Sequence, residues 1–91
     1  MITKINPDEA RRFATMLKAH ADELRRLDAT VSRRLLELHA ANWSDSKYDQ
    51  FERRYEEASV LLQTFAGKAE RYASYLNRKA ALIEPYLRRN Y

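Results

Sequence analysis

A seven-residue repeat of apolar side chains in the second half of the chain constrains the fold more than any other feature. One row consists of Tyr48, Tyr55, Leu62, Ala69, Leu76 and Ile83. An interleaved row consists of Phe51, Ala58, Phe65, Tyr72, Lys79 and Tyr86, in which Lys79 alone is charged. Such a repeat places side chains along one stripe of a helix that supercoils with a partner. Residues 45–88 are therefore predicted to form one long helix, with both rows in a helix–helix seam.

The first half of the chain carries a matching helical pattern. Its seam positions follow one another in steps of three or four residues, at Phe13, Leu17, His20, Leu24, Leu27, Val31, Leu35 and Leu38. Asn6 and Pro7 form a helix start, because the asparagine oxygen can accept a free backbone N–H and proline lacks the N–H that would be unpaired there. One helix is predicted over residues 7–41.

Residues 42–45, Asn-Trp-Ser-Asp, interrupt these two patterns. Asn, Ser and Asp favour turns and helix caps over helix interiors, and Ser44 or Asp45 can cap the second helix. A connection this short makes the two helices antiparallel neighbours. The predicted fold is all-α: one domain, residues 1–91, folded as a two-helix hairpin with a coiled-coil-like seam. Pro85 is expected to kink the second helix or to end its regular hydrogen bonding one turn earlier.

The hairpin has more apolar surface than its own seam can cover. Val60, Leu61, Leu82 and Leu87 widen the apolar face of the second helix, and Leu36 does the same on the first. Because two helices bury only one stripe each, this surplus predicts that two hairpins associate into a four-helix bundle. Glycine allows close approach of helices, tyrosine is enriched at interfaces, and the end of the longer helix can project. The interface candidates are Gly67, Tyr75, Tyr86, Leu87, Arg88 and Arg89.

Aromatic residues have two roles open to them at the seam and the turn. Tyr48, Tyr55 and Tyr72 are predicted to pack in the core, since they fall in the repeat. Trp43, the single tryptophan, can plug the end of the core at the turn, or it can form a groove with the helix end of a partner.

The residues that carry chemistry are too sparse for a catalytic or metal site. The chain contains no cysteine, which excludes a disulfide, a thiolate metal site and a cysteine nucleophile. His20 and His39 lie roughly 28 Å apart along one helix and cannot share a metal ion. There is also no glycine-rich phosphate loop. No enzymatic activity and no cofactor are expected, and His20 is predicted to be a polar interruption of the seam.

The alternative function is that of a small basic helical module that binds nucleic acid. The formal net charge is +4, but residues 1–41 carry eight basic and six acidic residues and residues 42–78 carry six of each. A nucleic-acid surface needs a concentrated basic face, so nucleic acid is the less favoured partner. No stretch approaches the roughly 20 apolar residues of a membrane span. The N-terminus lacks the apolar run of a signal peptide, so a cytoplasmic protein, or one secreted without a cleaved leader, is expected.

The chain resembles the WXG superfamily of small helical hairpins, the early-secreted-antigen-like proteins of type VII secretion. Family members share a similar length, two long helices, a central Trp-x-Gly bend and an aromatic or apolar residue eight positions after the tryptophan. Here Trp43 and Phe51 have that spacing, with Tyr48 between them, and Asp45 stands where the family has glycine.

The resemblance implies a bacterial, non-catalytic protein that dimerises and binds a protein partner. The partner would be a related hairpin, in a homodimer or a heterodimer, or a larger secreted or toxin protein. The implied role is that of a type VII-like secretion substrate, adaptor or chaperone. The family's C-terminal export signal, Tyr-x-x-x-Asp/Glu, has its spacing here at Tyr48 and Glu52, at the wrong end of the second helix.

Overall fold

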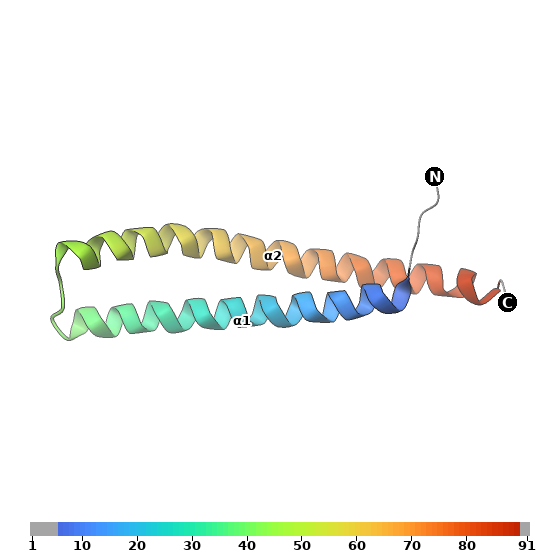
Figure 1. Ribbon diagram of the computed structural model, residues 1–91, viewed down its shortest axis with the longest axis horizontal. Helices are drawn as coiled ribbons and strands as arrows, with labels where there is room; N and C mark the ends of the chain where they lie inside the picture. Colours follow the sequence, from blue (N-terminus) through green and yellow to red (C-terminus); the bar gives the residue numbers. More distant parts are fainter. Residues whose placement is uncertain (1–5, 90–91) are drawn as a thin grey trace.

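The computed structural model is an antiparallel hairpin of two long helices. It describes residues 6–89, with the backbone alone described at Arg89. Helix α1 spans Pro7–Ala40 and helix α2 spans Ser46–Arg89. The two helices lie side by side along the whole of α1 (Figure 1). The all-α hairpin architecture predicted from the repeat and from the short polar break is thus confirmed.

The molecule is far more extended than a compact domain of its length. Its dimensions are 69 × 24 × 13 Å and its radius of gyration is 20.2 Å, whereas about 12 Å is expected for a compact domain of this size. With 44 residues against 34, α2 continues past the start of α1 at the end of the hairpin away from the turn (Figure 1). Over the described residues, neither helix is long and apolar enough to cross a membrane.

Helix α1 begins at the predicted cap. The Asn6 side-chain oxygen accepts hydrogen bonds from the backbone N–H groups of Asp8, at 3.1 Å, and Glu9, at 3.2 Å. Pro7 occupies the first helical position, where its missing N–H leaves no bond unmade. The carboxylate of Glu9 contacts Arg12 one turn later.

A left-handed residue and a side-chain cap build the turn between the helices. Asn42 has a φ of 67°, a backbone conformation that asparagine tolerates better than most residues. Its N–H donates to the His39 carbonyl at 3.0 Å, and the Trp43 N–H donates to the Leu38 carbonyl at 3.2 Å. These two bonds form a Schellman motif, which satisfies the last carbonyls of α1.

Asp45 then starts the second helix. Its carboxylate accepts a hydrogen bond of 2.7 Å from the backbone N–H of Tyr48, three residues later. This is the geometry of an N-cap. In the turn, Asn42 therefore reverses the direction of the chain, and Asp45 caps α2.

One of the two predicted heptad rows of α2 lies in the seam, and the other does not. Tyr48 and Ala69 are buried, and the other members of their row are half-buried. The row that contains Phe51, Phe65 and Tyr72 was wrongly assigned to the seam, because all of its members are exposed. Its place is taken by the residues one position later: Glu52, Ser59, Ala66, Ala73 and Ala80.

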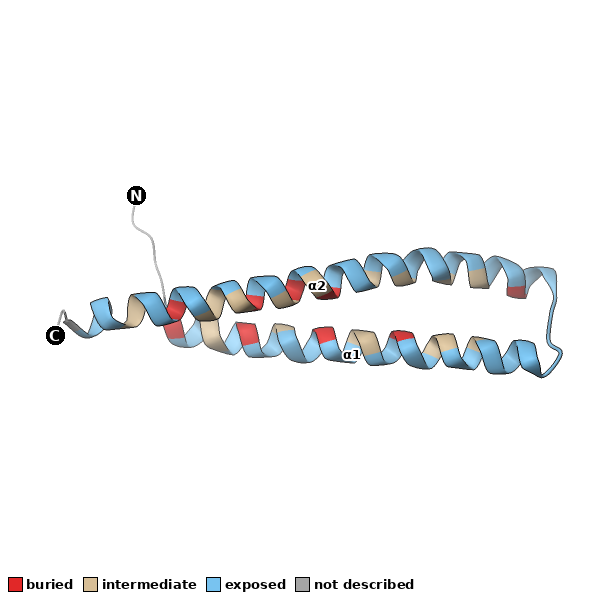
Figure 2. Cartoon of the chain, turned by 180° about the vertical axis from the view of Figure 1, so that it is seen from behind, coloured by how far each residue is buried: buried red, intermediate tan, exposed pale blue. Residues whose placement is uncertain are grey.

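The same one-residue offset occurs on α1. Leu17, Leu24, Val31 and Leu35 are half-buried as predicted, whereas Leu38, which was predicted to lie in the same seam, is 41% exposed beside the turn. Phe13, His20 and Leu27, which were predicted to share the seam, are exposed, and the buried row is Ala14, Ala21 and Asp28. Figure 2 shows the buried residues on the facing sides of the helices, most of them in the half away from the turn.

Side-chain size explains the offset. Among the described residues, the apolar side chains that are at most 1% exposed are all alanines: Ala14, Ala21, Ala66, Ala73 and Ala80. Two helices can approach closely when small side chains meet at their contact. A pair of helices has room for only one stripe from each partner. The alanines occupy that stripe, and the aromatic row beside it faces outward.

Pro85 does not end α2. The helix continues through it to Arg89, close to the end predicted at residue 88. Proline lacks the N–H that would pair with the Ala81 carbonyl, and near a helix end such a carbonyl can turn to water instead.

Candidate interaction surface

Ten exposed apolar side chains form one surface along the hairpin, which we call the apolar face. Each of them is between 43% and 71% exposed. Three belong to α1 and seven to α2: Phe13, Met16, Leu27, Phe51, Leu61, Phe65, Tyr72, Tyr75, Leu82 and Tyr86.

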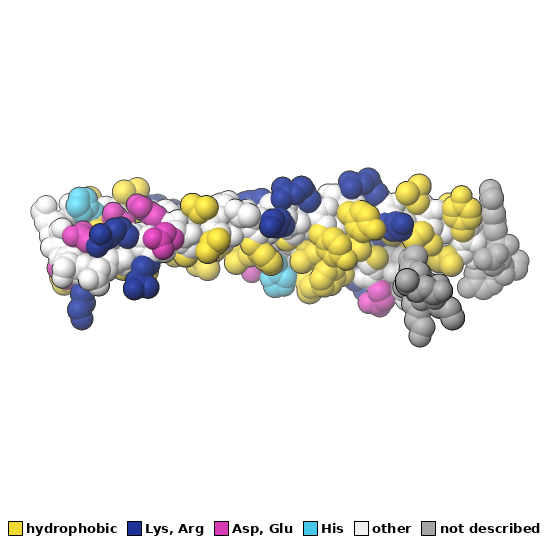
Figure 3. Space-filling model, turned by 90° about the horizontal axis from the view of Figure 1, so that it is seen from above, with side chains coloured by type: hydrophobic (Ala, Val, Ile, Leu, Met, Phe, Trp, Pro, Cys, Tyr) yellow, Lys and Arg dark blue, Asp and Glu magenta, His cyan; other side chains and the backbone are white. Residues whose placement is uncertain are grey.

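Aromatic contacts and helical spacing place these residues on one side of the molecule. The rings of Phe13 and Tyr72 meet edge to face across the two helices, with centroids 6.5 Å apart. Tyr72 also stacks on Tyr75, at 5.9 Å. Apart from Met16, three residues after Phe13, the others lie at multiples of seven from these three and so share their side. Apolar side chains gather from the middle of the molecule toward the end away from the turn in Figure 3.

Interhelical ion pairs mark the opposite side, which we call the ion-pair face. Arg11 contacts Glu84, and Arg25 contacts Glu70. In each pair the side-chain hydrogen bond raises the pKa of the arginine and lowers the pKa of the glutamate. Arg11 lies two residues before Phe13, about 200° around the helix. The charged and the apolar contacts of α1 therefore point to different sides of the hairpin.

A buried carboxylate interrupts the alanine seam. Asp28 is only 7% exposed. It accepts hydrogen bonds from the Tyr55 hydroxyl, from Ser59 Oγ at 2.8 and 2.9 Å, and from Gln63 Nε2 at 2.6 Å. These bonds, that of Tyr55 foremost, lower the pKa of Asp28 against the opposing effect of burial. Burial, with the bond to Asp28, raises the pKa of Tyr55. Neutral donors thus hold an ionised carboxylate inside the hairpin.

Neither heptad row predicted the Asp28 network. Its signal in the sequence is nevertheless simple. Asp28 lies seven residues after Ala21, in the row that proves to be buried. Its donors Tyr55, Ser59 and Gln63 follow one another at intervals of four, on one side of the facing helix.

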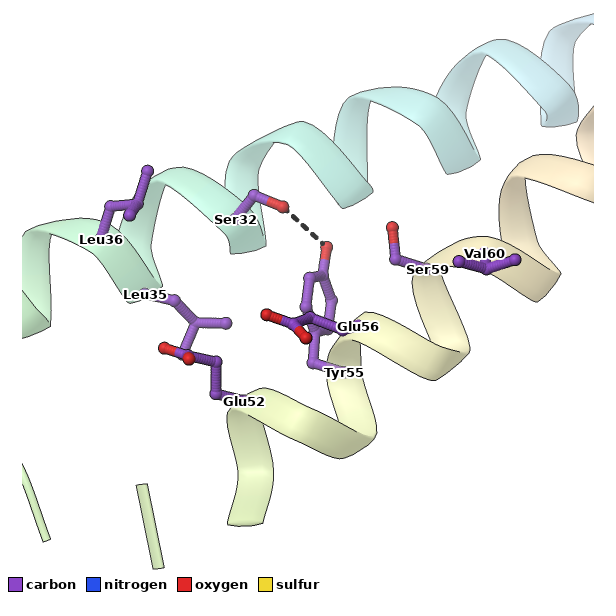
Figure 4. A pocket seen from close by; sticks show the side chains of 8 residues that line it. All are labelled: Ser32, Leu35, Leu36, Glu52, Tyr55, Glu56, Ser59 and Val60. Atoms are coloured by element: carbon purple, nitrogen blue, oxygen red, sulfur yellow. Dashed lines mark hydrogen bonds between the residues drawn. The ribbon is translucent and has the colours of Figure 1, made fainter. Parts of the chain in front are cut away.

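A shallow groove opens beside this network. Its lining comes from both helices and consists of Ser32, Leu35, Leu36, Glu52, Tyr55, Glu56, Ser59 and Val60 (Figure 4). The Tyr55 hydroxyl lies 3.4 Å from Ser32 Oγ, which donates a hydrogen bond to it. Leu36 and Val60 are 71% and 66% exposed, so they are apolar surface outside the apolar face.

The predicted turn motif separates into buried and exposed members. Trp43 is 56% exposed in the turn, so it does not plug the core. Tyr48 is buried, stacks on His39 at 5.9 Å, and donates a hydrogen bond of 2.9 Å to the Leu35 carbonyl. Burial raises the pKa of Tyr48. Phe51 is exposed and stacks on Tyr55, where the apolar face begins at the turn end.

The predicted interface candidates do not all share a surface. Tyr75 and Tyr86 belong to the apolar face. Gly67 is half-buried and lies about 200° around α2 from Phe65, on the side of the ion pairs. Leu87 is 41% exposed on the part of α2 that continues past α1, and Arg88 pairs with Glu84 at 3.5 Å. The side chain of Arg89 lies outside the described residues.

Comparison with known proteins adds no assignment to this geometry. No protein-family model matches the chain, and no curated protein matches it either. Over residues 6–89, no three His, Asp or Glu side chains come together as a group that could hold a metal ion. The most distinctive surface within that range is the apolar face.

Proposed function

We propose that this protein is a non-catalytic WXG-like hairpin that pairs with another helical hairpin through the apolar face, giving a four-helix bundle. In this role it acts as a substrate, adaptor or chaperone of a type VII-like secretion system. The observation that carries the pairing is the arrangement of side-chain sizes. Alanines close the hairpin's own seam, while Phe65, Tyr72 and their neighbours remain in water.

The exposed area supports a partner on physical grounds. Burying one large apolar side chain contributes about 1.5–3 kcal/mol. The largest apolar patch on a typical monomer covers about 300–600 Å². Here ten large apolar side chains follow one face of a molecule 69 Å long. A second hairpin laid on this face would bury them in a bundle with short, antiparallel connections.

The turn supports the WXG-like part of the proposal. Trp43 lies in the bend, directly after the left-handed Asn42. Asp45 caps α2, so the position of the family's glycine needs no unusual backbone angle here. Phe51, eight residues after Trp43, is the first aromatic residue of the apolar face. An exposed tryptophan at the tip also remains free to contact a partner's helix end.

Introducing a charge into the apolar face, with a matched substitution in the groove on the other side, tests the pairing. Tyr72→Glu introduces a carboxylate into the apolar face, whereas Leu36→Glu introduces one into the groove on the other side. We expect Tyr72→Glu to abolish both self-association in light scattering and capture of a partner hairpin, and Leu36→Glu to preserve them. Equal behaviour of the two variants would contradict the proposed surface.

Co-expression with the genes that flank this one tests the secretion role. We expect the tagged wild-type chain to copurify with a helical hairpin or with a larger secreted protein, and Tyr72→Glu to lose it. If the neighbouring genes encode no secretion component and none of their products binds, the secretion role fails while pairing can still stand.

A further inference from the structure

We infer that the groove beside the Asp28 network binds a helical segment of a second protein partner, one that carries an arginine between two aliphatic residues at intervals of about one helical turn. The arginine contacts Glu56, and the aliphatic residues contact Leu36 and Val60. This inference goes beyond the proposed function, because it concerns the side of the hairpin that the apolar face leaves open.

The groove continues the ion-pair face toward the turn. Residues at multiples of seven share one side of a helix in a hairpin with this repeat. Ser32 lies seven residues after Arg25, and Glu56 lies fourteen before Glu70. Because Arg25 and Glu70 form one of the interhelical ion pairs, the groove and the ion pairs lie on the same side.

The series of ion pairs lacks its third cation at the groove. The two interhelical pairs are fourteen residues apart on each helix. One more step of fourteen leads to Glu56 on α2 and to His39, and not an arginine, on α1. His39 stacks on the ring of Tyr48. Within residues 6–89, Glu56 forms no ion pair. An arginine from a partner would complete the series.

The charge of the lining selects a cationic partner. Glu52 and Glu56 are its two charged residues, although the chain as a whole has a net charge of +4. Both carboxylates lie in the space between α1 and α2 (Figure 4). Residues four apart on a helix are neighbours, so one planar guanidinium with five N–H donors can contact both carboxylates. An ammonium group lacks this fork, which is why arginine is favoured over lysine.

The hydroxyl groups on the floor of the groove are already paired inside the hairpin. Ser32 Oγ donates to the Tyr55 hydroxyl, and the hydroxyls of Tyr55 and Ser59 donate to Asp28. A ligand that needs these hydroxyls as donors would have to break the network. The two glutamates are therefore the charged acceptors that remain for a partner.

Two aliphatic side chains lie on either side of Glu56 along the groove. Ser32 and Tyr55 face each other across it, with 3.4 Å between their oxygens. Counted from this contact, Leu36 lies about 6 Å toward the turn and Val60 about 7.5 Å in the other direction, with Glu56 between them. Both aliphatic side chains are exposed. Four helical residues rise about 6 Å, so a partner helix with aliphatic, arginine and aliphatic residues at intervals of four repeats this order.

The dimensions of the groove suit such a helix. Its volume is about 490 Å³, within the range of about 300–1,000 Å³ for sites that hold a small ligand. A helix that lies in a groove presents a few anchor side chains at intervals of three or four residues. The methylene stem of an arginine packs on aliphatic surface while its guanidinium reaches a carboxylate.

Designed peptides test the site directly. The probe is an alanine-rich helical peptide with Leu, Arg and Leu at successive intervals of four residues, and its control has Gln in place of Arg. We expect the wild-type chain to bind the arginine peptide about tenfold more tightly in fluorescence anisotropy, because a charge-assisted hydrogen bond is lost in the control. Equal affinities, or no binding of the arginine peptide at about 1 mM, would overturn the inference.

Adjacent glutamates provide a matched pair of variants. We expect Glu56→Gln to weaken binding of the arginine peptide about tenfold. Glu57→Gln makes the same change at the next exposed residue, about 100° around α2, and should leave the affinity unchanged. Equal weakening by both variants would show only a general attraction to negative charge and would overturn the site.

Exchange of the charges tests direct contact. Glu56→Arg should lose the arginine peptide and bind a peptide with Glu in that position, whereas Glu57→Arg should not bind the glutamate peptide. Rescue by the exchanged pair requires that the two side chains meet. If the exchanged pair does not bind, or if Glu57→Arg binds equally well, the contact with Glu56 is overturned.

Two further variants separate this site from the apolar face. Tyr72→Glu should retain the arginine peptide, whereas Val60→Ala should weaken it about fivefold through lost apolar contact and leave self-association unchanged. Loss of the peptide in Tyr72→Glu would show that it binds the apolar face. Reduced self-association of Glu56→Gln in light scattering would show that a second copy occupies the groove. Either result would overturn this inference and leave the proposed function to its own test.

Discussion

Two neighbouring rows of side chains on α2 differ in burial: the inner row contains Ala66, Ala73 and Ala80, and the outer row contains Phe65 and Tyr72. Ala66, Ala73 and Ala80 are at most 1% exposed, whereas Phe65 and Tyr72, one residue before the first two, are more than half exposed. If hydrophobicity alone decided which row is buried, the aromatic row would be inside. Here the smaller row is inside. The difference indicates that small side chains, which let the two helices approach closely, decide the seam, and it leaves the larger side chains exposed on the apolar face.

The largest expected effect comes from enlarging the inner row. Ala73→Leu adds three carbon atoms where the alanine is 0% exposed, so the helices must separate. We expect the free energy of unfolding to fall by about 3 kcal/mol, measured by urea denaturation followed by circular dichroism. Val60→Leu, the same residue type introduced at an exposed position outside the apolar face, is the control and should leave that free energy nearly unchanged. Equal losses would show that the effect does not come from packing of the inner row.

The next largest effect comes from Asp28, the carboxylate in the buried row of α1. Asp28→Ala removes the acceptor for Tyr55, Ser59 and Gln63. We expect the free energy of unfolding to fall by about 2 kcal/mol, because buried donors lose a charged partner. Asp22→Ala, an exposed carboxylate on the same helix, is the control. A stability equal to that of the wild type would mean that the network contributes specificity and not stability.

The same carboxylate makes the free energy of unfolding depend on pH in the acidic range. The folded state lowers the pKa of Asp28, so its contribution is present above the ordinary aspartate pKa and is lost as the pH falls through the lowered value. Glu70 and Glu84, whose pKa values are also lowered, act in the same direction. We expect the free energy of unfolding to decrease below about pH 4, with a weaker decrease in Asp28→Asn. An identical pH profile for both proteins would contradict this assignment.

Shortening the outer row tests the other side of the comparison. Tyr72→Ala removes a ring that contacts Phe13 and Tyr75 at the surface. We expect the dimer dissociation constant to rise about thirtyfold, equivalent to about 2 kcal/mol for an aromatic interface residue. Sedimentation equilibrium measures it. Val60→Ala removes exposed apolar surface from the groove side and should leave the constant unchanged; a comparable rise there would argue for a second interface.

The seven-residue repeat, the caps and the short polar break were enough to predict the hairpin. They could not show which of two adjacent rows is buried. Phe51, Ala66 and Tyr72 all fit a helical stripe, and a shift of one residue rotates the stripe by only about 100°. The choice depends on how closely the helices approach, which is a property of the pair. For the same reason Asp28 was not recognised as a buried residue, because its donors lie on the other helix.

The smallest expected effect concerns the one glycine, which borders the inner row from the side opposite the aromatic residues. Gly67 has no unusual backbone angle, and an added Cβ would lie 3.4 Å from the flexible guanidinium of Arg71. Gly67→Ala should therefore raise the free energy of unfolding by about 1 kcal/mol, the difference in helix propensity. Measured by urea denaturation, the gain should be the same in a Tyr72→Glu background. Because this position lies about 200° from Phe65 around α2, the dimer dissociation constant should not change. A weakened dimer would place Gly67 in an interface and extend the pairing surface to the ion-pair face.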